Sequence, residues 1–275
     1  MTEFPLEELL PLLGVLLVSG AAAGIIAGLL GVGGGVVIVP ALLYAFELLH
    51  YDPTVTTHLA VGTSLATIVP TAISATRAHH KRGSVDWELL KRLAPAVMVG
   101  SILGALVAGE VGGNVLKGVF GVIALLMAAN LFRTRELVLG EQLPSVPVTS
   151  SSMGLIGFLS AMMGIGGGTL FVPFLNAFSV PIQRAVGTSS SLGIMIALPG
   201  ALGFMWVGGE VSGLPPLSLG YVSGVGLACM VPMTVLFAPQ GAKLAHRLEK
   251  KTLKRFFALF LVVMALRMFW KMFSA

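Results

Sequence analysis

Long apolar blocks separated by short polar loops run through almost the whole chain, and they constrain the fold more than any other feature. Residues 113–133, for example, read GNVLKGVFGVIALLMAANLFR. Such blocks are much longer than strands and lack the alternation of an outer-membrane barrel, so they predict helices that cross a membrane. Only 11% of the 275 residues are charged, whereas soluble domains carry about 25%. The sequence therefore predicts an all-α polytopic integral membrane protein, embedded in a lipid bilayer.

Several other classes find no support in the sequence. The acidic start MTEFPLEELLPLL is unlike the basic region of a signal peptide, so we expect the first apolar block to be retained. The formal charge of +5 comes from loops between apolar blocks, which is how membrane topology is set, so we expect no nucleic-acid partner. The single cysteine, Cys229, lies in an apolar run and allows no disulfide within the chain. We expect no metal site and no cofactor, because His79 and His80 have no further ligand at a suitable spacing.

The chain repeats its own motifs in the same order. GVGGGVVIVP at 31–40 matches GIGGGTLFVP at 164–173, and AVGTS occurs at both 60–64 and 185–189. Farther along, residues 104–132 align with residues 241–269 through shared glycine, alanine and phenylalanine positions. We therefore predict an internal duplication. Its parts are a first repeat at 1–133, a polar linker at 134–148 and a second repeat at 149–275.

Each repeat is expected to contain two short apolar pieces around the glycine run, followed by three longer helices, which gives 8–10 helices in all. The expected segments are 8–30, 36–49, 57–77, 91–110 and 113–133 in the first repeat, and 149–164, 168–180, 185–207, 216–238 and 252–272 in the second.

The basic loops predict that the two repeats have opposite orientations. The loop at 77–92 is strongly basic, whereas its counterpart at 207–216 has no basic residue. In the next loop the relation is reversed, because 243–255 is basic and 108–114 is not. Since basic loops stay cytoplasmic, we predict inverted repeats in a bacterial-type inner membrane, with both termini outside. Three basic residues fall outside in this arrangement: Lys117, Arg267 and Lys271.

Segments 36–49 and 168–180 are too short to cross a bilayer. About 13 helical residues rise only about 20 Å, while the hydrocarbon core is about 30 Å thick. We therefore expect two re-entrant hairpins, one from each side, whose glycine tips lie near the midplane. Full spanning by both limbs is the alternative.

The glycine tips are the candidate binding site. They lack the Lys-Ser/Thr of a P-loop and the preceding strand of a Rossmann fingerprint. Helix packing explains a spaced pair such as Gly24 and Gly28, but not three successive glycines, each of which weakens a helix by about 1 kcal/mol. The free N–H groups that start each returning limb favour an anion.

Hydroxyls after each tip could donate further hydrogen bonds, with helix capping as the alternative role. The predicted substrate-binding residues are Gly33, Gly34, Gly35, Thr63, Ser64, Gly166, Gly167, Gly168, Thr188, Ser189, Ser190 and Asn176. Arg184 could draw anions in or simply mark the cytoplasmic side. A lone histidine such as His58 is expected to be solvated.

The duplicated motifs GxGGGxxxVP and AVGTS, together with GSVDW at 83–87, resemble the TauE/SafE family of membrane transporters over essentially the whole chain. The resemblance implies transport of sulfur-containing anions such as sulfite and organosulfonates across the bacterial inner membrane. It also implies that the glycines, threonines and serines of these motifs bind the substrate. In the second repeat VPMTVLFAPQGA replaces the small-residue pattern GSILGALVAG of the first.

The predicted function is secondary transport of a small sulfur-containing anion by alternating access around a midplane site. A passive anion channel of the same fold is the main alternative. A membrane enzyme with Ser190 or Ser191 as nucleophile would lack a base at membrane depth, so no enzyme activity is expected. A scaffold protein would tolerate alanine at Gly34 and Gly167.

Overall fold

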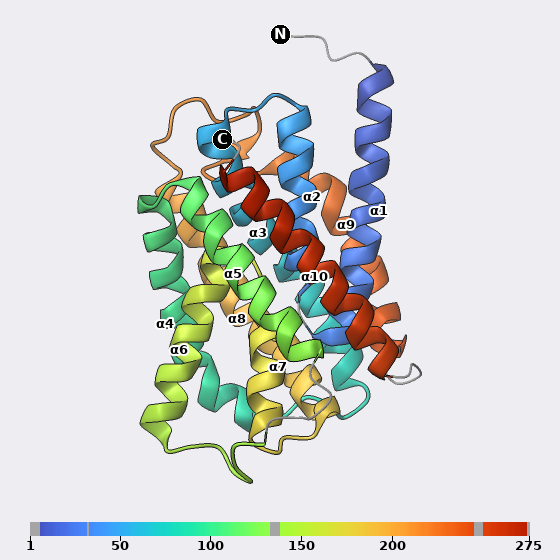
Figure 1. Cartoon of the computed structure of the whole chain (residues 1–275), viewed down its shortest axis with the longest axis vertical. Helices are drawn as coiled ribbons and strands as arrows, with labels where there is room; N and C mark the ends of the chain where they lie inside the picture. The colour runs from blue at the N-terminus through green and yellow to red at the C-terminus, as the bar shows by residue number, and fades with distance from the viewer. Residues whose placement is uncertain (1–5, 32, 133–137, 245–249, 274–275) are drawn as a thin grey trace.

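The computed structural model describes residues 6–31, 33–132, 138–244 and 250–273. In these ranges the chain forms ten helices and one short antiparallel ladder, which confirms the expected all-α fold (Figure 1). The helices are α1 (Leu6–Leu30), α2 (Gly35–Leu48), α3 (Pro53–His80), α4 (Trp87–Glu110), α5 (Gly113–Phe132), α6 (Val146–Met163), α7 (Gly168–Ala177), α8 (Ile182–Val207), α9 (Gly224–Leu244) and α10 (Lys250–Phe273). The ladder pairs β1 (Ser218–Leu219) with β2 (Val222–Ser223).

Seven helices in the described ranges are long and apolar enough to cross a membrane, namely α1, α3, α4, α5, α6, α8 and α9. The helices α2 and α7 are apolar but have only 14 and 10 residues. At 1.5 Å per residue they rise about 21 and 15 Å, which is less than the hydrocarbon thickness of about 30 Å. The chain is therefore a multi-pass membrane protein with two short helices among its spans.

Most helix boundaries match the sequence prediction, but α9 does not. It was expected at 216–238 and instead begins at Gly224 and ends at Leu244. The preceding residues turn through the β1–β2 ladder, where Leu217 and Gly220 take the left-handed φ values 61° and 53°. That backbone conformation cannot continue a right-handed helix, so the start of α9 is delayed. Residues 134–137 of the predicted linker lie outside the described ranges.

Each short helix returns to the end of the molecule from which its partner came. In Figure 1, α1 descends from the top and α2 climbs back to it, whereas α6 rises from the bottom and α7 returns there. A hydrogen bond of 2.7 Å from the Leu139 N–H to the Ala177 carbonyl links the end of α7 to the segment before α6. The glycine runs therefore form the tips of two hairpins that enter from opposite ends.

The remaining packing is reciprocal between the two halves. Helix α1 packs on α9, and its sequence counterpart α6 packs on α4, the counterpart of α9. Gly24 lies so close to α9 that an added Cβ would be 2.7 Å from the Thr234 carbonyl, and the matching Gly157 meets the Val97 carbonyl of α4. Close backbone approach is what glycine permits in membrane helices. Helices α3 and α8 pack on each other, as do α5 and α10.

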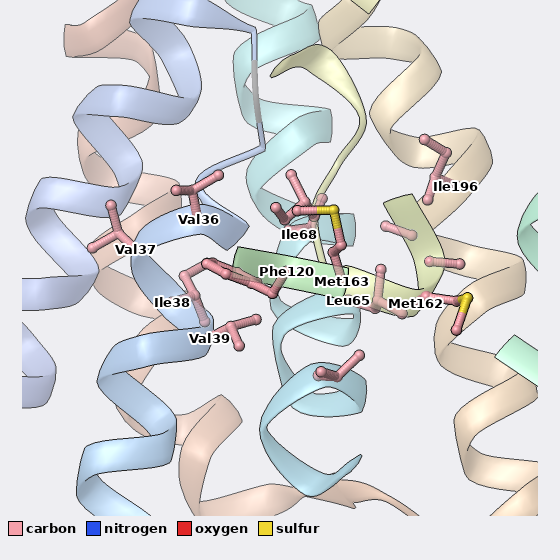
Figure 2. Packing of buried hydrophobic residues seen from close by; sticks show 14 of the residues in the cluster. Val36, Val37, Ile38, Val39, Leu65, Ile68, Phe120, Met162, Met163 and Ile196 are labelled. Atoms are coloured by element: carbon pink, nitrogen blue, oxygen red, sulfur yellow. The ribbon is translucent and has the colours of Figure 1, made fainter. Parts of the chain in front are cut away.

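The core surrounds the first turn of α2. Figure 2 shows Val36 and Ile38 of this helix near Ile68 of α3, Met163 of α6 and Phe120 of α5. All five side chains are buried. The tip of one hairpin is therefore packed against helices of both halves at the centre of the molecule.

Candidate glycine-tip site

Left-handed glycines turn the chain at both tips. Gly34 and Gly167 precede α2 and α7 with φ of 77° and 71°. Gly31 and Gly164, one at the start of each tip, have φ of 68° and 69°. A side chain at such an angle costs about 1–2 kcal/mol. The repeated GxGGG pattern thus encodes two sharp turns rather than weakened helices.

The two tips touch each other. A Cβ built on Gly33 would lie 3.1 Å from the Cα of Gly166, which is the residue matched to Gly33 in the repeat. Gly35 likewise approaches the carbonyl of Gly164 so closely that it has no room for a side chain. Any side chain here would separate the hairpins, so contact between the tips requires glycine at these positions.

The short helices begin at this contact without a side-chain cap. In the described residues no side chain accepts a hydrogen bond from the first turn of α2 or of α7. Gly35 and Val36 at the start of α2, and Gly168 and Thr169 at the start of α7, are buried. Helix N-termini carry free N–H groups and a partial positive charge. The centre therefore holds two buried, electropositive helix ends.

Hydroxyls from α3 and α8 lie beside the tips. Ser64 donates a 2.7 Å hydrogen bond to the carbonyl of Gly164. Ser190 donates to the carbonyl of Val186 at 3.1 Å, and its oxygen lies beside Gly31. Ser189, the counterpart of Ser64, is fully buried, and its hydroxyl has no hydrogen-bond partner in the described part of the chain. The buried Ser160, in the last turn of α6 before the second tip, likewise has a hydroxyl without a partner in the described residues.

The two threonines of the AVGTS motifs bind backbone instead. Thr63 accepts a hydrogen bond from the N–H of Ser223 at 2.8 Å, and Thr188 accepts one from the N–H of Asp86 at 3.0 Å. Gly62 and Gly187 let the same two segments approach, since added Cβ atoms would collide with the carbonyls of Tyr221 and Ser84. We call residues 83–86 and 220–223 the latch segments.

The two latch segments also correspond to each other in the repeat alignment, a match that the sequence prediction did not include. GSVD at 83–86 and GYVS at 220–223 fall opposite each other when the alignment of 104–132 with 241–269 is extended toward the N-terminus. Each begins with a left-handed glycine, at φ of 67° and 53°. Each ends with a residue whose side chain accepts an N–H from the following helix. The bonds run from Leu89 N to Asp86 Oδ1 (3.0 Å) and from Gly226 N to Ser223 Oγ (3.2 Å).

Asn176 and His58 do not lie where the sequence predicted. Asn176 is eight residues beyond Gly168 on α7, about 12 Å along the helix, so the structure does not bring it to the glycine contact. His58 was expected to be solvated, but it is buried in α3. Its Nε2 lies 3.0 Å from the Ala108 carbonyl and 2.9 Å from the Val111 carbonyl, because the end of α4 packs over it.

The three basic residues that the topology left outside lie near acidic or aromatic partners or an amide. Lys271 forms a 2.7 Å ion pair with Glu47, and Arg267 lies over the ring of Tyr44 at 5.1 Å from its centroid. Lys117 donates to Asn114 at 3.3 Å. Within the described ranges no group of three or more His, Cys, Asp or Glu is placed to hold a metal ion.

Together these features define a polytopic membrane protein with two glycine-tipped hairpins that meet at its centre. The family model for the sulfite exporter TauE/SafE matches residues 16–268. The chain therefore belongs to the TauE/SafE family, a family of membrane transporters.

Curated relatives agree with this assignment. A probable membrane transporter protein of Haemophilus influenzae is 34% identical over 258 residues, which cover 93% of this chain and 97% of the relative. The probable membrane transporter protein YunE of Bacillus subtilis is 28% identical, over 94% of this chain and 97% of its own length. A probable membrane transporter protein of Methanocaldococcus jannaschii is 26% identical, over 95% and 97%. No solved structure matches the chain.

Proposed function

We propose that this membrane transporter carries a small sulfur-containing anion, such as a sulfonate or sulfite, by alternating access around the glycine-tip contact. The repeats 1–133 and 149–275 would be inverted halves joined by the linker 134–148. The sulfur chemistry rests on the family description, which names sulfite export. The anion and its site rest on the geometry of the tips.

One observation carries the proposal: α2 and α7 both begin, buried and without side-chain caps, at the point where the tips touch. Buried N–H groups without partners are costly, so such helix ends are suited to hold an anion. The hydroxyl of Ser189 adds a further buried donor. None of the buried polar side chains in the described ranges is acidic, which favours an anion over a cation.

The reciprocal packing supports alternating access over a passive channel. Gly33 and Gly166 are in backbone contact at the centre, which suits a central barrier between the two sides. Each AVGTS helix is tied to one latch segment, and the two segments lie at opposite ends of the molecule (Figure 1). Release of one segment at a time would open the centre to one side only, which is what a transporter requires.

Orientation belongs to the same proposal. The end of the molecule with residues 77–92 and the start of α8, here called the basic end, would face the cytoplasm of a bacterial-type cell. Both termini would lie outside, because α1 begins and α10 ends at the opposite end (Figure 1). Impermeant thiol labelling of single cysteines at Arg82 and Gly213, in a Cys229→Ala background, would test this placement.

The test of the transport proposal is uptake by proteoliposomes that contain the purified protein. Saturable uptake or exchange of sulfite, taurine or another sulfonate is expected, and the same anions should raise the melting temperature. Ser189→Ala should weaken substrate binding without lowering thermal stability, because its hydroxyl has no partner to lose. Ser218→Ala, which removes another buried hydroxyl without a partner in the described residues but outside the tips, is the control. Flux without saturation would favour a channel, and stabilisation by cations alone would overturn the anion site.

A further inference from the structure

We propose that a cavity at the basic end is a second anion site, in which Arg184 and Arg92 hold the tetrahedral oxyanion head of the substrate on its way to or from the centre. This inference rests on the proposed function, because it names the same anion as ligand. It differs in location and in residues, so it can fail independently.

The cavity has a volume of about 360 Å³. That lies within the range of roughly 300–1,000 Å³ typical of small-molecule pockets. Its walls come from the start of α4, the residues before α6, the turn between α7 and α8, and the start of α8. Two cations, Arg92 and Arg184, and two carboxylates, Asp86 and Glu141, line it.

Arg184 is held only loosely in this cavity. A guanidinium nitrogen lies 3.6 Å from Asp86 Oδ2, and the side chain is 58% exposed. A guanidinium binds oxyanions best through two parallel hydrogen bonds, and such pairs are much stronger than a single long contact. A sulfonate or sulfite could therefore replace Asp86 as the partner of Arg184.

The start of α8 adds to the positive field of the two arginines. Its N-cap is Pro181, and no side chain caps the first turn in the described residues. The corresponding start of α3 is capped by the carboxylate of Asp52, which accepts the Thr54 N–H at 2.8 Å. The N-terminus of α3 is therefore neutralised by the Asp52 carboxylate, whereas the N-terminus of α8 faces the cavity without a capping carboxylate.

Asp86 connects the cavity to the centre. Its Oδ2 faces Arg184, its Oδ1 caps α4, and its backbone N–H is bound by Thr188. An anion on Arg184 would replace one of the two polar contacts by which Asp86 is held against α8, and the hydrogen bond to Thr188 is the other. Entry of substrate at the basic end would therefore loosen the segment that blocks the way to Thr188.

The latch segment at the opposite end, residues 220–223, has no charged pair of this kind. The residue that corresponds to Asp86 is Ser223, and the residue that corresponds to Arg184 is the buried Leu59. The anion-sensitive latch is therefore confined to one side of the transporter, although both latch segments make the same backbone contact.

Tryptophan fluorescence can report on this cavity without a transport assay. Trp87 follows Asp86 directly and is one of three tryptophans in the chain. In a Trp206→Phe and Trp270→Phe background it is the single reporter, and titration with taurine or sulfite gives an affinity. Nanodiscs of zwitterionic and of anionic lipid separate a soluble anion from a lipid headgroup phosphate as the ligand.

Three variants in this background decide the question. Arg184→Gln should weaken the titration about tenfold or more, since it removes a charge-assisted contact. Asp86→Asn keeps a good N-cap but removes the competing charge, so it should tighten binding about threefold or more. Arg82→Gln, an exposed arginine at the same end that does not line the cavity, should leave the affinity unchanged.

Equal affinities in the Arg184→Gln variant and its parent would overturn the site, and so would a loss of the titration in anionic nanodiscs alone, which would assign the cavity to lipid. If Arg184→Gln transports the anion with the same concentration dependence as the parent protein, the second anion site is overturned, but the proposed function is not. The absence of uptake of any sulfur oxyanion by the parent protein would overturn the proposed function instead.

Discussion

The two latch segments make the same contacts with different charges. In one, Thr63 holds the N–H of Ser223, and in the other Thr188 holds the N–H of Asp86. Both final residues cap the next helix, but only Asp86 also meets an arginine. The backbone geometry of the two latch segments therefore follows from the duplicated motifs, whereas their electrostatics differ.

The tips give the sharpest test of this equivalence. Gly34→Ala and Gly167→Ala should each abolish transport and lower the melting temperature strongly. Alanine pays about 1–2 kcal/mol for the left-handed backbone and about 1–3 kcal/mol for overpacking. The added Cβ would lie 2.6 Å from the Ala23 carbonyl in one tip and the same distance from the Phe171 ring in the other.

Gly213→Ala is the matched control for the tips. Gly213 has a φ of 83°, but a Cβ there meets nothing within 4 Å. This variant should therefore lose only the stability that corresponds to the strained backbone, and it should still transport. Full transport by either tip variant would contradict a functional role of the tips.

The paired helix contacts predict equal losses of stability in the two halves. Gly24→Ala on α1 and Gly157→Ala on α6 should each lower the free energy of unfolding by about 1–3 kcal/mol, because both push against a facing carbonyl. Gly14→Ala, on α1 with open space around it, should have little effect. Chemical denaturation in detergent measures the differences, and a loss in one half alone would break the equivalence.

Removing a threonine hydroxyl should affect the stability of the two latch segments to different extents. Thr63→Val and Thr188→Val each leave a backbone N–H without its acceptor, at a cost of about 1 kcal/mol or slightly more. We expect the smaller loss for Thr188→Val, because the Asp86–Arg184 pair still holds that segment. Thermal melts should show this difference disappear in an Asp86→Asn background. Serine at either position should restore stability, and equal losses in the original background would contradict the charge difference.

The smallest effect concerns the start of α3. Hydrogen bonds from the Thr54 side chain and backbone hold the pKa of Asp52 below its usual range. A carboxyl with a lowered pKa in the folded state stabilises the protein above its ordinary pKa, and this contribution is lost as the pH falls through the lowered value. The melting temperature of the parent should therefore fall relative to Asp52→Asn between about pH 5 and pH 3. A constant difference across this range would show that the charge contributes nothing.

Much of the fold was predictable because membrane helices are local in sequence. Apolar block lengths gave the ten helices within a few residues, except at α9, where the turn through β1 and β2 depends on non-local contacts with the AVGTS helix. The hairpins were predictable because a 14-residue helix cannot cross the bilayer. The candidate site was predictable in part: glycines and hydroxyls gather at the centre, Asn176 lies farther along α7, and the contacts of Asp86 with Thr188 and Arg184 were not foreseen.

The class of protein, the repeated motifs and the two glycine turns follow from the sequence alone, since these depend on composition, period and backbone freedom. Tertiary structure alone decided that Gly33 meets its own counterpart Gly166, that Thr63 and Thr188 bind latch segments, and that Asp86 faces Arg184. Each of these contacts joins residues about a hundred or more positions apart. Their partners are chosen by how the helices pack, and no local pattern encodes that choice.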